Sequence, residues 1–365
     1  ANTVSKTIGV TGTKGKSTTV SLIYHLLKCA GFNARLGGNI GTPVLELLDK
    51  SYDWVVIELS SHQLWQVTKS PHIAVFLNIF ADHLDYSDFH SYFDAKKNIA
   101  RFQTPSDFFI YNGSFPTLTR FADRVKSQKY IFGIKSANLP SCTVLGNDLV
   151  FAESGNSEKI CDLVNMPLLG STGKQNIAAA ALVAKILGVS NTLIDRGLKC
   201  FTPLRGRLEN IGIYDSLTIF EDYLATIPEA TLNALEVLEG QVKCVFLGGH
   251  ERNQDYTRVL AEISRQRIPL VILFPPNGAR IKSQFDSLSQ SFKPQLFLVA
   301  TMQDAVSKMF IHTERPGTVL FSTGAPSFGM FKDYADRSRQ FHYWLNKLKK
   351  SSSLIIQSEP APGRA

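Results

Sequence analysis

A glycine-rich turn near the start of the sequence constrains this chain more than any other feature. Residues 9–18 read GVTGTKGKST and stand between a short apolar strand, expected over residues 7–10, and an amphipathic helix, expected over residues 17–30. Glycines allow backbone N–H groups to turn inward around phosphate oxygens, and the N-terminus of the helix adds positive potential. The pattern predicts a phosphate loop, in which Lys16 neutralises the β and γ phosphates of a nucleotide and the Ser17 hydroxyl binds magnesium.

The match to the general phosphate-loop pattern is incomplete at one position. The pattern G-x-x-x-x-G-K-[ST] requires glycine where this sequence has Val10. A tight turn that carries a lysine by coincidence is the alternative interpretation. The strand–turn–helix context and the intact GKST ending favour the phosphate loop. The residues predicted to bind the nucleotide phosphates are Gly12, Thr13, Lys14, Gly15, Lys16, Ser17 and Thr18.

The composition excludes several classes of protein. Hydrophobic residues make up 44% of the 365 residues and charged residues 19%, which is typical of a globular protein of two or three domains. The longest apolar run, residues 73–81, is too short for a membrane span. The five cysteines are scattered without a CxxC pair, so the sequence predicts neither a zinc knuckle nor a disulfide framework. A reducing, cytoplasmic location is expected.

The formal net charge of +8 raises the alternative of nucleic-acid binding. The basic residues are spread along the sequence, and the densest group, at 347–350, closes a helix, where cations favour the carbonyl end. A protein that handles phosphates and carboxylates explains the sign of the charge equally well. We therefore expect no nucleic-acid partner.

Strand and helix patterns alternate in two separate blocks, which predicts an α/β fold with two domains. In the first block, residues 1–203, continuous apolar runs at 54–59, 73–79 and 108–111 are typical of a mostly parallel buried sheet. Residues 130–169 change to short alternating strands, a small β-rich part with a hairpin turn at 146–148. An alanine-rich helix is expected over residues 176–187.

The second block, residues 204–350, begins at the boundary sequence PLRGR, residues 203–207. Strands are expected at 244–247, 270–274, 296–299 and 319–322, alternating with helices near 228–238, 256–266, 278–288 and 302–312. This alternation predicts a second open, Rossmann-like α/β domain with a mostly parallel sheet. The last helix is expected over about 328–349, followed by a disordered tail at 351–365.

Two candidate metal ligands follow strands of the first block. Glu58 ends one apolar run, and His83 comes shortly after the next. Ligands of open α/β sheets bind at the carboxyl ends of the strands, and magnesium prefers oxygen donors such as Glu58. A helix-capping role for Glu58 and an ordinary loop position for His83 are the alternatives. Their position around a phosphate loop favours metal binding.

The sequence resembles the Mur ligases along nearly its whole length, and most closely their MurD branch, which adds D-glutamate to UDP-N-acetylmuramoyl-L-alanine. The resemblance is carried by a series of motifs: TGTKGKST at 11–18, GGNIG at 37–41, ELSSHQL at 58–64, Asn78, DHLD at 82–85 and YFDAK at 92–96. It implies ATP as nucleotide and two magnesium ions. It also implies that Lys16, His83 and Lys96 are catalytic, that Ser17, Glu58, His83 and Lys96 bind metal, and that Lys96 is carbamylated. A carbamate is an anionic oxygen ligand, whereas composition alone suggests a solvated helix lysine. Asn39 is expected to contact the muramoyl substrate.

The resemblance also assigns residues farther along the chain. Asn176 matches an adenine-contacting asparagine, Arg207 an arginine near the nucleotide, and Asp222 the first residue of a DSKAT motif, so all three are expected to bind ATP. The acceptor amino acid is expected to contact Thr226, Arg252, Ser327 and Tyr334. This sequence departs from the family motifs at several positions. It has Leu224 and Arg252 where the motifs have lysine, and Gly329 where they have aspartate. Thr172 and Gly173 stand in place of the first two residues of an HNxxN motif.

By this resemblance the chain is expected to be an ATP-dependent amide ligase of peptidoglycan precursor synthesis. UDP-N-acetylmuramoyl-L-alanine and D-glutamate are the implied substrates, joined through an acyl phosphate. Because the phosphate loop begins at residue 9, the family's UDP-binding domain is expected to be a separate or removed partner. Two alternatives stay open at this point. One is another ligase of the superfamily with a different amino-acid acceptor, and the other is a nucleotide-binding interaction module that does not ligate.

Overall fold

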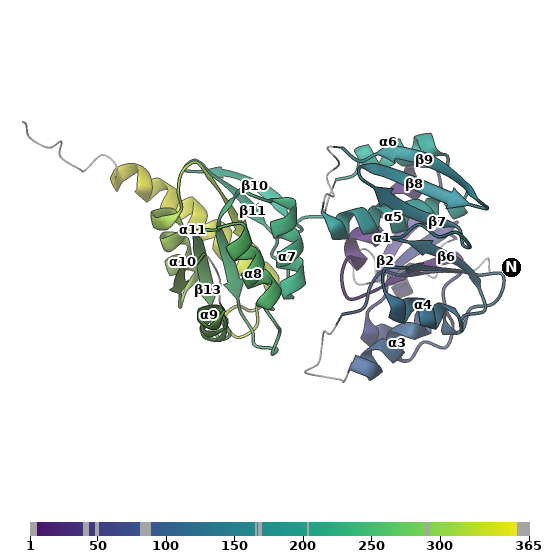
Figure 1. Ribbon diagram of the computed structural model, residues 1–365, viewed down its shortest axis with the longest axis horizontal. Coiled ribbons are helices and arrows are strands. Elements are labelled where there is room, and N and C mark those ends of the chain that lie inside the picture. The colour runs from purple at the N-terminus through teal and green to yellow at the C-terminus, as the bar shows by residue number, and fades with distance from the viewer. Residues whose placement is uncertain are drawn as a thin grey trace, which may run out of the picture. The chain divides into compact units, whose positions relative to one another are not determined.

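The structure is a computed structural model that describes residues 6–38, 44–47, 51–80, 89–164, 166, 170–202, 204–288 and 292–355. The chain divides into two compact units, Ala1–Leu204 and Arg205–Ala365. The division falls one residue from the boundary expected at 203/204. Each unit is an α/β sheet with helices on both faces (Figure 1).

The first unit is built on a nine-stranded sheet in the order β2-β3-β1-β4-β5-β6-β7-β8-β9. Pairing is parallel from β2 through β7 and antiparallel from β7 to β9. The expected apolar strands are therefore confirmed, and so is the hairpin turn at 146–148. The strands are β1 Lys6–Thr11, β2 Ala34–Gly38, β3 Trp54–Glu58, β4 Ile73–Phe76, β5 Phe108–Asn112, β6 Gln128–Phe132, β7 Ser141–Leu145, β8 Asp148–Glu153 and β9 Asn156–Asp162.

Helices cover both faces of this sheet and enclose two large apolar cores, beside a small cluster of Leu47, Val55 and Ile57. One core lies under α1, α5 and α6, and the other under α2, α3 and α4 (Figure 1). The alanine-rich helix α5 is buried along most of its length because small side chains allow it to pack closely against α1. The helices are α1 Lys16–Cys29, α2 Ser61–Trp65, α3 Phe89–Arg101, α4 Pro116–Ala122, α5 Ser171–Ile186 and α6 Asn191–Lys199, with a 3₁₀ turn η1 at Val44–Leu47.

The second unit has a six-stranded sheet in the order β10-β11-β15-β12-β13-β14. All pairs are parallel except β10 with β11, a hairpin that the sequence pattern did not reveal. One face packs on α10 and α11 and the other on α7, α8 and α9. The elements are β10 Glu209–Tyr214, β11 Leu217–Glu221, β12 Val242–Gly248, β13 Leu270–Phe274, β14 Gln295–Leu298, β15 Gly317–Phe321, α7 Pro228–Val237, α8 Thr257–Arg265, α9 Gly278–Ser287, α10 Met302–His312 and α11 Tyr334–Ile355.

The last helix differs from its expected position at both ends. α11 begins at Tyr334 instead of residue 328, and it continues to Ile355. Residues 328–333 form turns instead of a helix, and Phe331 is buried there. The expectation of a disordered tail is therefore wrong for residues 351–355, which are helical.

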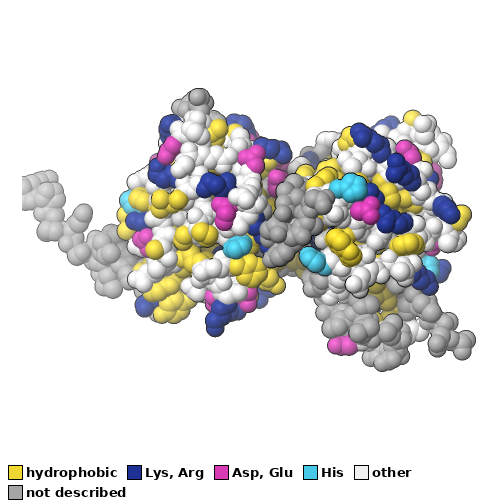
Figure 2. Space-filling model, turned by 90° about the horizontal axis from the view of Figure 1, so that it is seen from below, with side chains coloured by type: hydrophobic (Ala, Val, Ile, Leu, Met, Phe, Trp, Pro, Cys, Tyr) yellow, Lys and Arg dark blue, Asp and Glu magenta, His cyan; other side chains and the backbone are white. Residues whose placement is uncertain are grey.

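The surface charges, the helix lengths and the cysteines can be compared with the classes of protein that the composition excludes. On the face drawn in Figure 2, Lys and Arg side chains are dispersed among acidic and hydrophobic ones instead of forming a continuous basic stripe. Among the helices of the described residues, none is long and apolar enough to cross a lipid bilayer. All five cysteines are free thiols, and three of them are buried.

Candidate functional site

The glycine-rich turn adopts a conformation that only glycine tolerates at Gly15, which precedes α1. Gly15 has φ +78°, in the left-handed region. A Cβ atom there would lie 2.4 Å from the Oδ1 atom of Asn176 on α5. The structure thus brings Asn176 against the turn, as expected for two parts of one nucleotide site. Gly15 also leaves the start of α1 without a side-chain cap.

Asn78 holds the turn in place. Its carbonyl accepts a hydrogen bond from the Thr13 amide (3.1 Å), and its Oδ1 accepts one from the Lys14 amide (2.8 Å). Its Nδ2 donates to the Lys14 carbonyl (3.1 Å). The sequence motifs included Asn78 but gave it no role, because its partner is a turn 64 residues away. Its place just after β4, beside β1 in the sheet, explains the contact.

Two lysines from opposite faces of the sheet converge on the turn. The Lys16 ammonium donates to the carbonyls of Gly12 and Thr13, both at 3.0 Å. The Lys96 ammonium, on α3, donates to the same Gly12 carbonyl at 3.0 Å and to Thr11 Oγ1 at 3.4 Å. Lys96 is only 1% exposed, and its ammonium also lies over the ring of Tyr92, 4.8 Å from its centroid. Two cations so close together favour an anion at this position.

The turn is tied to the segment after β4 by Thr13. Its Oγ1 accepts a hydrogen bond from the Phe80 amide (3.0 Å) and lies 3.2 Å from the hydroxyl of Tyr92. The Lys14 ammonium lies over the Phe80 ring, 5.0 Å from its centroid. The other two predicted residues, Ser17 and Thr18, occupy the first turn of α1, where Ser17 is partly exposed and Thr18 is buried.

Glu58 lies at the carboxyl end of its strand, at the same end of the sheet as the glycine-rich turn. β1 and β3 are parallel with Val10 opposite Glu58, so both strands end beside the turn. Glu58 is 5% exposed, and among the described residues its Oε2 atom has no hydrogen-bond partner. A buried carboxylate oxygen is costly unless it is paired with a cation or coordinates a metal. Glu58 therefore fits the ligand set of a magnesium ion.

The other predicted metal ligands are the Ser17 hydroxyl, a carbamate on Lys96 and His83. Within the described part of the chain, no three His, Cys, Asp or Glu side chains cluster in a way that could hold a metal ion. A magnesium ion on Glu58 could take its other oxygen ligands from the Ser17 hydroxyl, from a carbamate on Lys96, from water and from nucleotide phosphates. The predicted ligand His83 and the predicted substrate residue Asn39 lie outside the described residues.

The second unit places two predicted ATP residues beside each other. Asp222 directly follows β11 and is buried, and Ser322 Oγ donates to its Oδ2 atom at 3.3 Å. Burial raises the pKa of Asp222, and the neighbouring positive charge of Arg207 partly offsets this effect. Arg207 donates from Nη1 to the Leu224 carbonyl at 3.1 Å.

The predicted acceptor residues follow three neighbouring parallel strands. Thr226 comes after β11, Ser327 after β15 and Arg252 after β12, so all three lie at the same edge of the second sheet. The segments are joined by hydrogen bonds: Gln254 Nε2 donates to the Thr226 carbonyl at 3.2 Å. Tyr334, at the start of α11, is half-exposed, and its ring stacks on Tyr223 with centroids 6.1 Å apart.

Comparison with known proteins identifies the family. Residues 10–184 match the model of the Mur ligase middle domain. A UDP-N-acetylmuramoylalanine–D-glutamate ligase of Christiangramia forsetii is 31% identical over 340 residues, which cover 92% of this chain and 75% of that protein. The chain belongs to the Mur ligase family. The phosphate loop, Glu58, Lys96 and Asn176 all fall within the residues that match the middle domain of the Mur ligases.

Relatives of this Mur ligase include enzymes named for either enantiomer of glutamate. A UDP-N-acetylmuramoyl-L-alanine–L-glutamate ligase of Xanthomonas campestris pv. campestris is 32% identical over 343 residues, covering 92% of this chain and 71% of that protein. Among solved structures, the MurF ligase of Thermotoga maritima in complex with ADP superposes with a TM-score of 0.68 at 18% identity, covering 95% of this chain and 81% of that one. That likeness shows the fold, and it confirms the α/β architecture expected from the sequence.

Proposed function

We propose that this protein is an ATP-dependent amide ligase that adds D-glutamate to UDP-N-acetylmuramoyl-L-alanine in the cytoplasm, as a step of peptidoglycan precursor synthesis. One observation carries the proposal: two lysines and a buried carboxylate surround one phosphate loop in a chain that matches a D-glutamate ligase over 92% of its length. That arrangement suits the charge of a triphosphate and its metal.

The reaction has two steps. The alanine carboxylate of the UDP-linked substrate attacks the γ phosphorus of ATP, which forms an acyl phosphate and releases ADP. The amino group of glutamate then attacks the acyl carbon, phosphate leaves, and the amine loses a proton as the amide forms. Activation by phosphate is needed because a carboxylate is a poor electrophile.

The chain's own residues serve the first step by binding and orienting the phosphates. The first backbone amides of α1 would donate hydrogen bonds to phosphate oxygens, and Lys16 would neutralise charge that develops on the transferred group. Glu58, Ser17 and a carbamylated Lys96 would hold magnesium, which supplies further positive charge for the phosphate oxygens. Two magnesium ions are expected, and His83 is expected to contribute to metal binding.

Binding of the acceptor belongs to the second unit. Arg252 provides a guanidinium for an acceptor carboxylate, and the hydroxyls of Thr226 and Ser327 provide hydrogen bonds. Tyr334 offers a half-exposed aromatic face beside them. Leu224 stands where the family motif has a lysine, so this site has one cation fewer than the family pattern. We therefore expect weaker binding of the same acceptor instead of a different acceptor.

A ligation assay tests the proposal. The protein is supplied with ATP, magnesium and UDP-N-acetylmuramoyl-L-alanine, and ADP release is measured with D-glutamate, L-glutamate and a panel of other amino acids. We expect release to depend on D-glutamate and on the UDP substrate together. Preference for another amino acid would favour a different ligase of the superfamily. ATP binding without amino-acid-dependent ADP release would favour the interaction module.

A further inference from the structure

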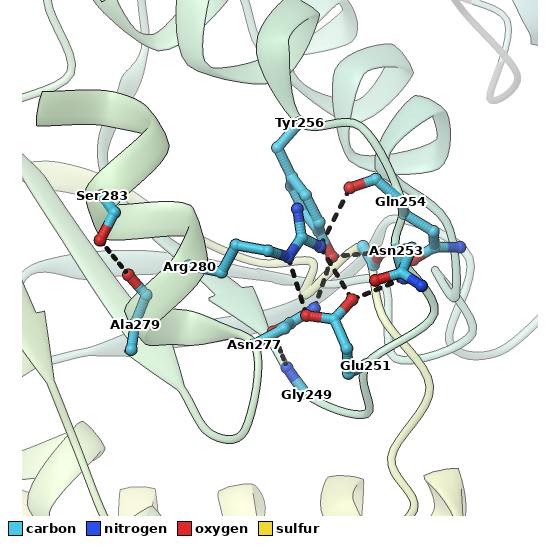
Figure 3. A network of polar contacts seen from close by, with 10 residues as sticks. Gly249, Glu251, Asn253, Gln254, Tyr256, Asn277, Ala279, Arg280 and Ser283 are labelled. Carbon is cyan, nitrogen blue, oxygen red and sulfur yellow. Dashed lines mark hydrogen bonds and ion pairs between the residues drawn. The ribbon is translucent and has the colours of Figure 1, made fainter. Parts of the chain in front are cut away.

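The loop 249–256 lies between β12 and α8 (Figure 3) and is hydrogen-bonded to the segments that carry the predicted acceptor residues Thr226 and Ser327. Arg252 lies within it. The Gln254 side chain donates to the Thr226 carbonyl at 3.2 Å, and the His250 amide donates to the carbonyl of Pro326, the residue before Ser327, at 2.9 Å. The position of this loop therefore determines how the acceptor residues are arranged.

Arg280, on α9, clamps the turn that contains Arg252. Its Nε and Nη2 atoms donate to the two carboxylate oxygens of Glu251 at 2.8 and 2.9 Å. Its Nη2 atom also donates to the Gln254 carbonyl at 3.1 Å. Figure 3 shows the guanidinium reaching from α9 to both residues. One planar group thus fixes residues 251 and 254, and Arg252 lies between them.

The turn includes one residue with an uncommon backbone conformation. Asn253 has φ +53°, in the left-handed region, which asparagine adopts more readily than other residues with a side chain. Its amide donates to Glu251 Oε1 at 2.6 Å, the oxygen that also accepts from Arg280. The pairing with Arg280 lowers the pKa of Glu251, which keeps that acceptor ionised.

The ends of the loop are fixed by other contacts. The Gly249 amide donates to Asn277 Oδ1 at 2.8 Å, and Asn277 Nδ2 donates to the Tyr256 hydroxyl at 3.3 Å. That hydroxyl donates to the Gly324 carbonyl at 2.8 Å. Tyr256 and Asn277 are each at most 1% exposed. Loss of Arg280 should therefore loosen residues 251–254 while the loop stays attached at both ends.

We propose that Arg280 is a positioning residue for the acceptor amino acid. It holds Glu251 and Gln254 so that Arg252 and Thr226 are arranged before the acceptor carboxylate binds. The inference rests on the proposed ligase function, and it requires no contact between Arg280 and the substrate. Preorganisation of this kind lowers the cost of binding, so its loss appears in the affinity for the acceptor.

The first experiment separates acceptor binding from ATP use. Arg280→Ala should raise the KM for D-glutamate by about 10- to 100-fold, while the KM for ATP stays within about threefold of the parent. Arg280→Lys should recover only part of the affinity, because an ammonium cannot bridge Glu251 and Gln254 as a planar fork does. Arg265→Ala is the matched control: Arg265 pairs with Glu262 and Glu239 in the same unit and does not contact the loop.

A mutant cycle and hydrogen exchange complete the test. Glu251→Gln combined with Arg280→Ala should be no worse than Arg280→Ala alone, because both remove the same clamp. Backbone amides at 251–254 should exchange faster in Arg280→Ala than in the parent and in Arg265→Ala. A D-glutamate KM within about twofold of the parent in folded Arg280→Ala, or unchanged exchange at 251–254, overturns the positioning role. Hydrogen exchange is measured without substrate, so it tests the positioning role even if the parent protein does not use D-glutamate. Absence of D-glutamate-dependent activity in the parent would contradict the proposed function alone.

Discussion

At the scale of single residues, the carbonyl oxygen of Gly12 is the point where the site is assembled. It accepts hydrogen bonds from both Lys16 and Lys96, which come from helices on opposite faces of the sheet. Two neighbouring ammonium groups repel each other, and the repulsion is stronger where water is excluded, as it is around Lys96. Conversion of Lys96 to a carbamate would replace this repulsion with attraction. The burial of Lys96 beside Lys16 is compatible with the proposed carbamate.

Lys16→Ala and Glu58→Ala should each lower ATP turnover by about 10- to 150-fold while the protein stays folded. The reason is that each removes charge next to the transferred phosphate, where one charged hydrogen bond contributes about 1.5–3 kcal/mol. The measurement is ATP hydrolysis or ligation beside circular dichroism. Lys28→Ala, an exposed position on the same helix as Lys16, is the control. Turnover within tenfold of the parent in both site variants would contradict the assignment.

Lys96→Ala should abolish activity, and formate or acetate should partly restore it by occupying the place of the carbamate oxygens. Because Lys96 is buried, Lys96→Met is a second variant that keeps most of the side-chain volume and should be inactive too. The control is Lys97→Ala, whose ammonium pairs with Asp94 at 3.0 Å. The carbamate proposal fails if Lys96→Met is as active as the parent, or if added carboxylates restore neither variant.

At the scale of elements, one ion pair joins α11 to the sheet of the second unit. His342 Nε2 lies 2.9 Å from Glu221 Oε2, and Glu221 is only 1% exposed. The hydrogen bond with Glu221 raises the pKa of His342 above its ordinary value. The folded protein therefore holds this proton more tightly than the unfolded chain does. The stabilisation is fully present below the unfolded-state pKa and disappears as pH rises through the folded-state pKa.

His342→Gln keeps a hydrogen-bond donor but removes the charge, so it should lower stability at acidic pH and much less at alkaline pH. We expect a loss of about 0.5–1 kcal/mol near pH 5.5, since His342 is partly exposed and solvent weakens the pair. Thermal unfolding at about pH 5.5 and about pH 9 measures this, with His312→Gln as a control on α10. A loss equal at both pH values would show that the charge plays no part.

Individual helices and strands show where sequence patterns predict the structure and where they fail. Strands such as β3 and β13 were predicted because a strand that is buried on both faces has a nearly continuous apolar sequence. Every residue in these two strands is buried. The β10–β11 hairpin was missed because its turn residues, Asp215 and Ser216, both have positive φ without being glycine or asparagine. α5 begins at Ser171, five residues earlier than expected, because its first turn is polar and contains Gly173.

The site was predictable to the extent that its chemistry is local. The phosphate loop lies within ten residues, so its pattern alone indicates its function. The roles of Asn78 and Arg280 depend on which strands are neighbours and where α9 packs, and neither follows from spacing along the chain. Lys96 was assigned only by resemblance, since its burial against the turn results from the packing of α3.

At the scale of the whole molecule, each unit has its own sheet and its own apolar cores. We predict that residues 1–204 and 205–355 fold separately when expressed as two polypeptides. Each should unfold cooperatively, with a midpoint within about 8 °C of one transition of the full chain. Calorimetry of the three samples is the measurement. A fragment that melts without a cooperative transition, or binds a dye for exposed apolar surface, would show that the units depend on each other.

The uncapped start of α1 has a consequence for how this protein responds to its substrate. The side chains of Ser60, Ser190 and Thr301 cap α2, α6 and α10, whereas α1 begins without a side-chain cap, as α5 and α8 also do. α1 is packed against α5, α6 and the three strands β1, β2 and β3, yet Gly15 has no side chain that could cap it. A triphosphate bound there, as proposed, would supply hydrogen-bond acceptors for the first backbone amides of α1. The nucleotide would then stabilise the folded first unit, so the unfolding temperature should rise with nucleotide concentration.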